Sequence, residues 1–203
     1  MTYFEFDFQH TKEYHDLKNI YTNYLKIDNI KFNLFQGDIT AGINWIWAEN
    51  ENTLNYFNRF IDSININDML TNISNEKFKV RGASFITIDH NIVNNSDFHY
   101  DVISQCDGDD THILTIIFPL YELEKDMGHL EYKKNDETKI YTYDINKLVV
   151  WDSCKFLHRT QPYIIREPKH RVLVSINLST DEKWAVDAVN NCLRYQGNLL
   201  WID

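Results

Sequence analysis

Apolar and polar residues alternate with two different periods along the first 76 residues. Apolar positions recur at helical spacing over residues 11–26, where Thr11 has the character of an N-cap, and over residues 52–64, where Asn52 takes that place. Other stretches alternate with a period of two, which is typical of half-buried strands. The expected strands are 2–9, at a sheet edge, 31–35 and 39–48, and a short third helix is expected to end near residue 74.

The pattern changes at residue 77 and stays uniform to residue 179. Short runs rich in β-branched and aromatic residues are separated by polar, turn-forming clusters, which favours a sandwich or barrel. Thr180 is followed by acidic residues, so a C-terminal helix is expected, and the tail 198–203 could add a strand. The sequence shows no repeat and no linker, so residues 1–203 are expected to form one domain. Residues 77–179 would be its β-core, residues 1–76 would pack on that core, and residues 180–203 would form a C-terminal helix and tail.

Composition narrows the classes of partner. The chain has 203 residues and a formal net charge of −10, which argues against loose affinity for nucleic acid. Cys106, Cys154 and Cys192 are widely spaced, and indicate neither a disulfide framework nor a zinc ribbon. No secretion signal or membrane-spanning run is evident, so we expect a soluble, cytoplasmic protein without a membrane partner.

The candidate chemistry lies in the β-region. His99 and Asp101 are two residues apart, so on a strand both side chains would project from the same face, and His158 is the best candidate for a third ligand. Two imidazoles and one carboxylate with open opposite positions suit iron(II) that binds a co-substrate and dioxygen. Arg171 opens the apolar run 172–176, and on a strand it would carry a guanidinium into a cavity, where an anionic co-substrate could bind.

The order of these features resembles the iron(II)- and 2-oxoglutarate-dependent dioxygenases. After the His-x-Asp pair, residues 111–120 resemble the family's next strand, Gly128-His129-Leu130 resembles its Gly-x-Leu strand, and residues 147–151 resemble the strand before the distal histidine. The resemblance covers roughly residues 98–179. It implies a mainly β fold with flanking α-helices, a double-stranded β-helix or jelly roll, with the metal at its mouth.

The resemblance also implies a reaction and its cofactors. Fe(II) would be held by the three ligands, and the far carboxylate of the co-substrate 2-oxoglutarate by Arg171, whose planar fork matches a carboxylate. A hydroxyl partner is expected, first Thr115 and second Ser175. With O2, 2-oxoglutarate would give succinate and carbon dioxide while a substrate is hydroxylated, and assays would need ascorbate or another reductant.

Departures from the family pattern bear on the substrate. Met127-Gly128-His129-Leu130 replaces the Gly-Gly-x-Thr of collagen-type prolyl hydroxylases, and Arg171 lacks the Arg-x-Ser context of the plant small-molecule enzymes. Nucleic-acid demethylases carry a second arginine where this chain has Asn177, so no nucleic-acid substrate is expected. We expect an amino acid, a peptide residue or a small metabolite. The proposed pocket residues, chosen by proximity in sequence, are Arg81, Trp151, Asp152 and Arg159.

Three alternatives stay open. His129 and Glu131 have the same ligand spacing as His99 and Asp101, although the resemblance places their strand away from the metal. A cupin-like metal enzyme without 2-oxoglutarate would have a cavity lacking an arginine clamp, and a jelly-roll binding protein would hold no stoichiometric metal. Tyr100 is interpreted as a packing residue, and the sequence leaves the substrate and the oligomeric state undetermined.

Overall fold

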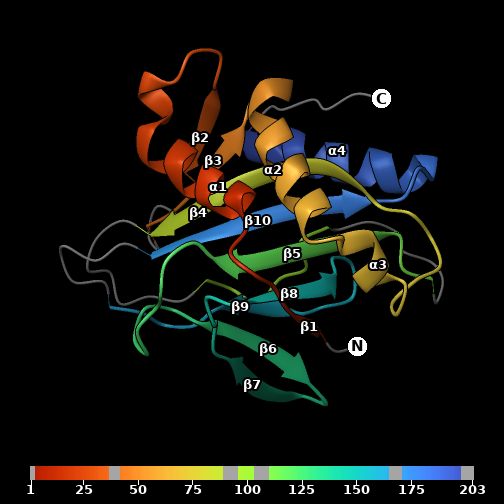
Figure 1. Ribbon diagram of the computed structural model, residues 1–203. Helices are drawn as coiled ribbons and strands as arrows, with labels where there is room; N and C mark the ends of the chain where they lie inside the picture. Colours follow the sequence, from red (N-terminus) through yellow and green to blue (C-terminus); the bar gives the residue numbers. More distant parts are fainter. Residues whose placement is uncertain (1–2, 37–41, 89–95, 103–109, 165–170, 198–203) are drawn as a thin grey trace.

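Two antiparallel sheets form the body of the protein (Figure 1). The computed structural model describes residues 3–36, 42–88, 96–102, 110–164 and 171–197, so the strand expected at 198–203 lies outside the described residues. The larger sheet has the order β1-β8-β5-β10-β4-β3-β2, and the smaller has the order β7-β6-β9. The strands are β1 Phe4–Asp7, β2 Phe32–Gln36, β3 Ile43–Ala48, β4 Lys79–Ile88, β5 Ile113–Pro119, β6 Leu130–Lys134, β7 Glu137–Tyr141, β8 Lys147–Asp152, β9 His158–Thr160 and β10 Arg171–Ser179.

Helices cover one face of the large sheet. The apolar stripes of α1 (Lys12–Asn23) and α2 (Glu51–Ser63) pack on the even-numbered residues of β5, β8 and β10, and this forms the main core. Thr11 caps α1, as expected, by accepting a hydrogen bond from the Tyr14 N–H. The cap expected at Asn52 was wrong, because Asn50 accepts from the Thr53 N–H and α2 therefore begins at Glu51. The short α3 spans Ile66–Leu70.

The opposite face of the large sheet is covered by two different elements. The small sheet packs over β5, β8 and β10 through Leu130, Trp151 and Leu173. Beside it, α4 (Lys183–Gly197) packs through Leu193 and its neighbours on Trp47 and Ile113. A Cβ atom on Gly82 would lie 2.9 Å from a methyl carbon of Leu193, so glycine lets the helix approach the sheet closely. The site described below lies between the small sheet and α4.

The observed architecture confirms the jelly-roll fold with flanking helices that the sequence predicted. The first strand lies at an edge of the large sheet, as expected, where β1 pairs with β8. Cys154 is disulfide-bonded, a pairing that the cysteine spacing did not indicate, while the Cys192 thiol is free. None of the described helices is both long enough and apolar enough to cross a membrane.

Candidate metal centre

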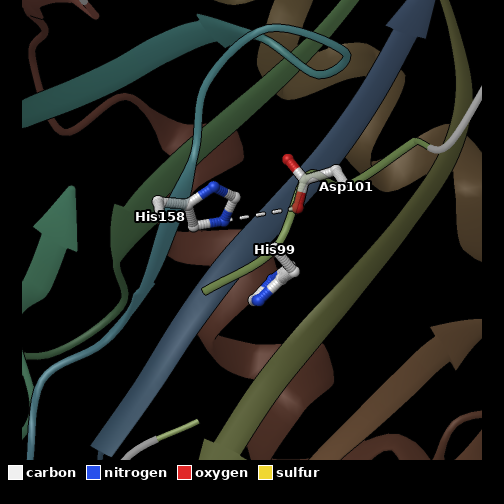
Figure 2. Close-up of side chains that lie close together, drawn as sticks. All are labelled: His99, Asp101 and His158. Atoms are coloured by element: carbon white, nitrogen blue, oxygen red, sulfur yellow. Dashed lines mark ion pairs between the residues drawn. The ribbon is translucent and has the colours of Figure 1, made fainter. Parts of the chain in front are cut away.

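Two of the three predicted ligands come from an irregular segment, where the sequence had suggested a strand. Residues 96–102 are joined to β9 by an isolated bridge, in which the backbone N–H groups of His99 and His158 each donate to the other residue's carbonyl, at 2.9 and 3.1 Å. The Val102 N–H donates to the Ser153 carbonyl at 3.2 Å. These bonds hold His99 and Asp101 beside His158, although the histidines are far apart in sequence (Figure 2).

In each imidazole, one nitrogen contacts a backbone carbonyl oxygen and the other does not. Nδ1 of His99 is 2.8 Å from the Asp97 carbonyl oxygen, and Nδ1 of His158 is 3.0 Å from that of Phe156. A carbonyl can only accept, so both Nδ1 atoms carry a proton, and Nε2 of each ring is the atom that can bind a metal when the imidazole is neutral. Bonds of this kind orient metal-binding histidines in proteins.

The two oxygens of the Asp101 carboxylate likewise have different contacts. Its Oδ2 accepts hydrogen bonds from Thr115 Oγ1 and Trp151 Nε1, both at 2.7 Å, while Oδ1 lies 3.4 Å from Nε2 of His158. Burial alone would raise the pKa of Asp101, but the charge and hydrogen bond of His158 hold that pKa far below its usual range. The carboxylate is therefore ionised, with one oxygen turned toward the histidines.

Nε2 of His99, Oδ1 of Asp101 and Nε2 of His158 form a set of donor atoms suited to a metal ion. One ligand atom from each of His99, Asp101 and His158 lies within 4.8 Å of the others, and this is the only group of three or more such residues in the described part of the chain that could hold a metal. Two neutral imidazole nitrogens and one carboxylate oxygen are the facial donor set of non-haem iron(II), and manganese, nickel or zinc accept the same donors. The chemistry of the donors therefore fits the metal that the sequence suggested.

A cavity of about 130 Å³ is lined by the three ligands and by Arg171. Arg171 is 2% exposed, and its Nε and Nη2 donate to the Gly128 carbonyl at 3.0 and 2.9 Å. Its buried Nη1 has no hydrogen-bond partner in the described part of the chain. Although burial lowers the pKa of Arg171, a guanidinium stays charged in proteins, so Nη1 is a free donor for an anion.

Gly128 itself is held in a conformation that other residues avoid. Its φ is +76°, and a Cβ atom there would lie 3.0 Å from the Cβ of Tyr163. The carbonyl that orients Arg171 therefore belongs to a backbone position that requires glycine. Ser175, four residues after Arg171 on β10, also lines the cavity, as a hydroxyl partner of an anion would.

Two of the expected pocket residues contact Asp101 and are not among the residues that line the cavity. Thr115, expected next to the co-substrate, and Trp151, expected next to the substrate, both hydrogen-bond Asp101. Tyr100, interpreted from the sequence as a packing residue, is 42% exposed and lines the cavity. The irregular backbone of residues 96–102 explains this difference, because strand alternation does not apply there.

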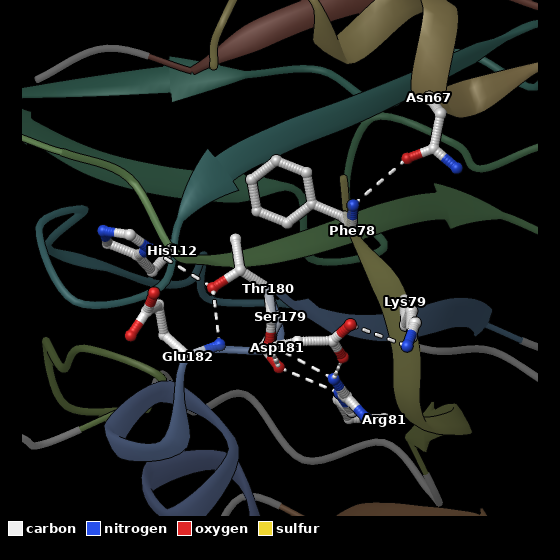
Figure 3. A network of polar contacts seen from close by, with 9 residues as sticks. All are labelled: Asn67, Phe78, Lys79, Arg81, His112, Ser179, Thr180, Asp181 and Glu182. Carbon is white, nitrogen blue, oxygen red and sulfur yellow. Dashed lines mark hydrogen bonds and ion pairs between the residues drawn. The ribbon is translucent and has the colours of Figure 1, made fainter. Parts of the chain in front are cut away.

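The remaining expected pocket residues have other contacts and do not line the cavity. Figure 3 shows Arg81 in a network at the start of α4, where it donates to Ser179 Oγ at 3.0 Å and pairs with Asp181 at 2.6 Å. Asp152 accepts from Thr111 Oγ1 at 3.0 Å. The structure thus gives both side chains partners away from the metal ligands.

His129 and Glu131, the second pair with ligand spacing, also have partners elsewhere in the protein. Nδ1 of His129 accepts from the Tyr143 N–H at 3.1 Å. Glu131 pairs with Arg159 at 2.7 Å, and Arg159 lies over the ring of Phe98, 4.3 Å from its centroid. Arg159 therefore packs on the segment that carries His99 and does not reach the cavity.

Sequence reasoning missed several residues of the cavity wall. Trp45 and Trp47 on β3 and Gln196 on α4 line it. The tryptophans' spacing of two residues did place both indoles on one face, but nothing in the sequence said which face was the cavity. Gln196 gave no signal, since a glutamine near a helix end is ordinary.

Solved structures of low sequence identity share this architecture. A prolyl hydroxylase from Trichoplax adhaerens, in complex with a hypoxia inducible factor oxygen degradation domain peptide, aligns over 92% of this chain and 86% of its own, with a TM-score of 0.62 and 13% identity. The non-heme alpha ketoglutarate dependent carbocyclase SnoK of nogalamycin biosynthesis aligns over 99% and 89%, with a TM-score of 0.68 and 8% identity. HygX from Streptomyces hygroscopicus, with nickel, 2-oxoglutarate and hygromycin B bound, aligns over 89% and 83%, with a TM-score of 0.61 and 7% identity.

No protein-family model and no curated protein sequence matches the chain. Structural similarity at this level of sequence identity therefore shows the fold. The chemistry has to be inferred from the residues of the site. The chain has the fold of the iron(II)- and 2-oxoglutarate-dependent oxygenases, and His99, Asp101 and His158 come together in it as a possible metal site.

Proposed function

We propose that the protein is an iron(II)- and 2-oxoglutarate-dependent oxygenase that hydroxylates a peptide-borne residue, an amino acid or a small metabolite. The observation that carries this proposal is the presence, in one cavity, of the His99–Asp101–His158 group and of a buried arginine with a free donor. A cupin-like enzyme without 2-oxoglutarate would need no such arginine. The clamp therefore favours 2-oxoglutarate as the co-substrate.

Each residue has a role that follows from its contacts. His99, Asp101 and His158 would hold the metal through Nε2, Oδ1 and Nε2, since their other polar atoms are engaged. The bound iron would supply the oxidative chemistry, in which 2-oxoglutarate and O2 give succinate, carbon dioxide and a hydroxylated product. Arg171 would bind the far carboxylate through Nη1, assisted by the hydroxyl of Ser175.

The rest of the cavity would orient the co-substrate and exclude water. Ile117, Leu130 and Leu173 give it an apolar lining near the arginine. In such surroundings the contact between a guanidinium and a carboxylate is stronger than it would be in water. The chain's net charge of −10 and Asn177, at the position of a second arginine, support a substrate other than nucleic acid. A cytoplasmic location remains part of the proposal.

The proposal is tested by co-substrate turnover in protein reconstituted anaerobically with iron(II). Succinate release that needs both O2 and 2-oxoglutarate, with ascorbate present, is the expected result even without the true substrate. His99→Ala and Asp101→Ala should abolish it, and His15→Ala, an exposed histidine on α1, should not. Equal metal content and turnover in wild type and His99→Ala would contradict the metal assignment.

Co-substrate binding is tested separately at Arg171. Arg171→Ala should weaken 2-oxoglutarate binding by at least about 100-fold, because losing one partner of a buried charged pair costs on the order of 3 to 5 kcal/mol. Arg59→Ala, which removes a partly exposed arginine on α2, is the matched control. If Arg171→Ala bound 2-oxoglutarate as tightly as wild type, the assignment of Arg171 to the far carboxylate would be wrong.

A further inference from the structure

Beyond the metal ligands and Arg171, the described residues of the cavity wall are uncharged, and several of them are polar. Among the described lining residues, Asp101 and Arg171 are the only acidic or basic side chains, histidines aside. The first is a proposed metal ligand, and the second is assigned to the co-substrate. No described lining group therefore remains to pair with an ammonium or a carboxylate of the substrate.

One donor in this wall has no partner. Trp47 is 2% exposed, and its Nε1 forms no hydrogen bond with any described residue. On the large sheet Trp47 lies directly opposite Ser84, which in turn lies opposite Ser175, so the indole and the Ser175 hydroxyl share the cavity face. Buried indole N–H groups usually have a partner, so an acceptor from a bound molecule is the natural complement.

Two amide side chains also line the cavity. Gln196 lies four residues after Cys192 on α4, and both face the cavity. The Cys192 thiol donates to the Asp101 carbonyl at 3.3 Å, which ties this turn of the helix to the metal segment. On β10, Asn177 lines the cavity, and its side-chain nitrogen is 3.5 Å from Thr115 Oγ1, a weak contact. Each amide can donate and accept, as peptide groups do.

We infer that this wall, formed by Trp47, Asn177 and Gln196, recognises an uncharged substrate segment that carries a carbonyl or amide group beside the carbon to be oxidised. The inference rests on the proposed function and narrows its substrate class. A residue inside a peptide and a neutral amide-bearing metabolite share this chemistry. A free amino acid does not, because its ammonium and carboxylate would lose water without gaining counter-charges from the described lining residues.

The cavity's size supports the same class. Its volume of about 130 Å³ is below the roughly 300 Å³ at which pockets for whole drug-sized ligands begin. Since the cavity must also admit the co-substrate, only a small part of the substrate can enter it. The rest would lie outside, past the exposed ring of Tyr100 at the rim.

The test uses protein loaded with zinc and N-oxalylglycine, an inert analogue of 2-oxoglutarate. Its probes are the twenty amino acids, each as the free zwitterion and as the N-acetyl amide, with N-alkyl acetamides as neutral non-peptide amides. The indole N–H resonance of Trp47, assigned with Trp47→Phe, reports binding by its chemical shift. Binding of N-oxalylglycine is measured first and independently, so a failure of the proposed function is recognised before any probe is added.

We expect at least one N-acetyl amide to shift the Trp47 resonance and to bind at least about tenfold more tightly than its zwitterion. Loss of one neutral hydrogen bond should weaken that probe about three- to tenfold in Trp47→Phe and in Gln196→Leu. Trp184→Phe, which alters an indole on α4 outside the cavity, should leave its affinity unchanged. Shifts by the alkyl acetamides alone would assign the wall to a neutral metabolite.

If N-oxalylglycine binds and a free amino acid binds more tightly than its capped form, the inference is wrong. It is equally wrong if no neutral probe moves the Trp47 resonance. Failure of N-oxalylglycine to bind would instead remove the proposed function, on which the inference depends. Gln196→Leu serves as the second variant should Trp47→Phe fold poorly, because Gln196 is only partly buried.

Discussion

Thr115→Val isolates one of the hydrogen bonds that hold the carboxylate of Asp101, a proposed metal ligand. Valine keeps the shape of threonine and removes the hydroxyl that donates to Asp101 Oδ2 at 2.7 Å. Hydrogen bonds to charged groups contribute about 1.5 to 3 kcal/mol, and loss of a bond to a metal ligand typically lowers metal affinity 10- to 100-fold. The indole of Trp151 still donates to the same oxygen, so we expect the lower part of this range, about 10- to 30-fold.

The measurement is zinc or manganese affinity of the metal-free protein, by competition with a chromogenic chelator. Thermal unfolding of the metal-free proteins is recorded in parallel, because Thr115 also lies 2.8 Å from Ser153 Oγ and its loss could lower stability. Thr138→Val is the matched control, since this threonine on β7 is exposed and its hydroxyl accepts a hydrogen bond from Lys133 Nζ at 2.9 Å. A Thr115→Val protein that folds normally and binds metal within twofold of wild type would refute the reasoning.

The remaining predictions concern stability. Gly128→Ala should lower the free energy of unfolding in urea by about 1 to 3 kcal/mol, because alanine is strained at a φ of +76°; an unchanged midpoint would contradict this. Removing zinc with a chelator should lower the melting temperature of wild type but not of His158→Ala, since a ligand at 100 times its Kd contributes about 2.7 kcal/mol. Hydrogen bonds from Lys79 and Arg81 lower the pKa of Asp181 below its ordinary value of about 4, so its stabilising effect is present above that pH and fades as the pH falls. In urea unfolding, Asp181→Asn should therefore be less stable than wild type at pH 7, and the difference should shrink as the pH falls below about 4.

The parts of the site that sequence could predict are those encoded by local spacing. The two-residue interval between His99 and Asp101, the later His158, and an arginine opening an apolar run were visible without a structure. The alternation of β10 likewise placed Ser175 on the face of Arg171. These relations depend only on the period of a strand.

The contacts that complete the site join residues remote in sequence, which periodicity does not pair. Asp101 is held by Thr115, Trp151 and Cys192, which come from two strands and the last helix. The backbone at Asp101 is irregular, so the face of Tyr100 could not be deduced from a strand pattern. Sequence predicts what each strand offers to a face, and the topology decides which faces meet.

The hydrogen bonds between Arg171 and the Gly128 carbonyl give the cavity a fixed depth. Because two guanidinium nitrogens are bound to a backbone oxygen, the third cannot move along the cavity without breaking both bonds. A diacid one methylene shorter than 2-oxoglutarate would leave that nitrogen without its partner, at a cost of about 1 to 3 kcal/mol, and a longer one would have to buckle. If 2-oxoglutarate binds as proposed, the fixed place of this backbone-anchored cation would select the chain length of the co-substrate, independently of the residues that select the substrate.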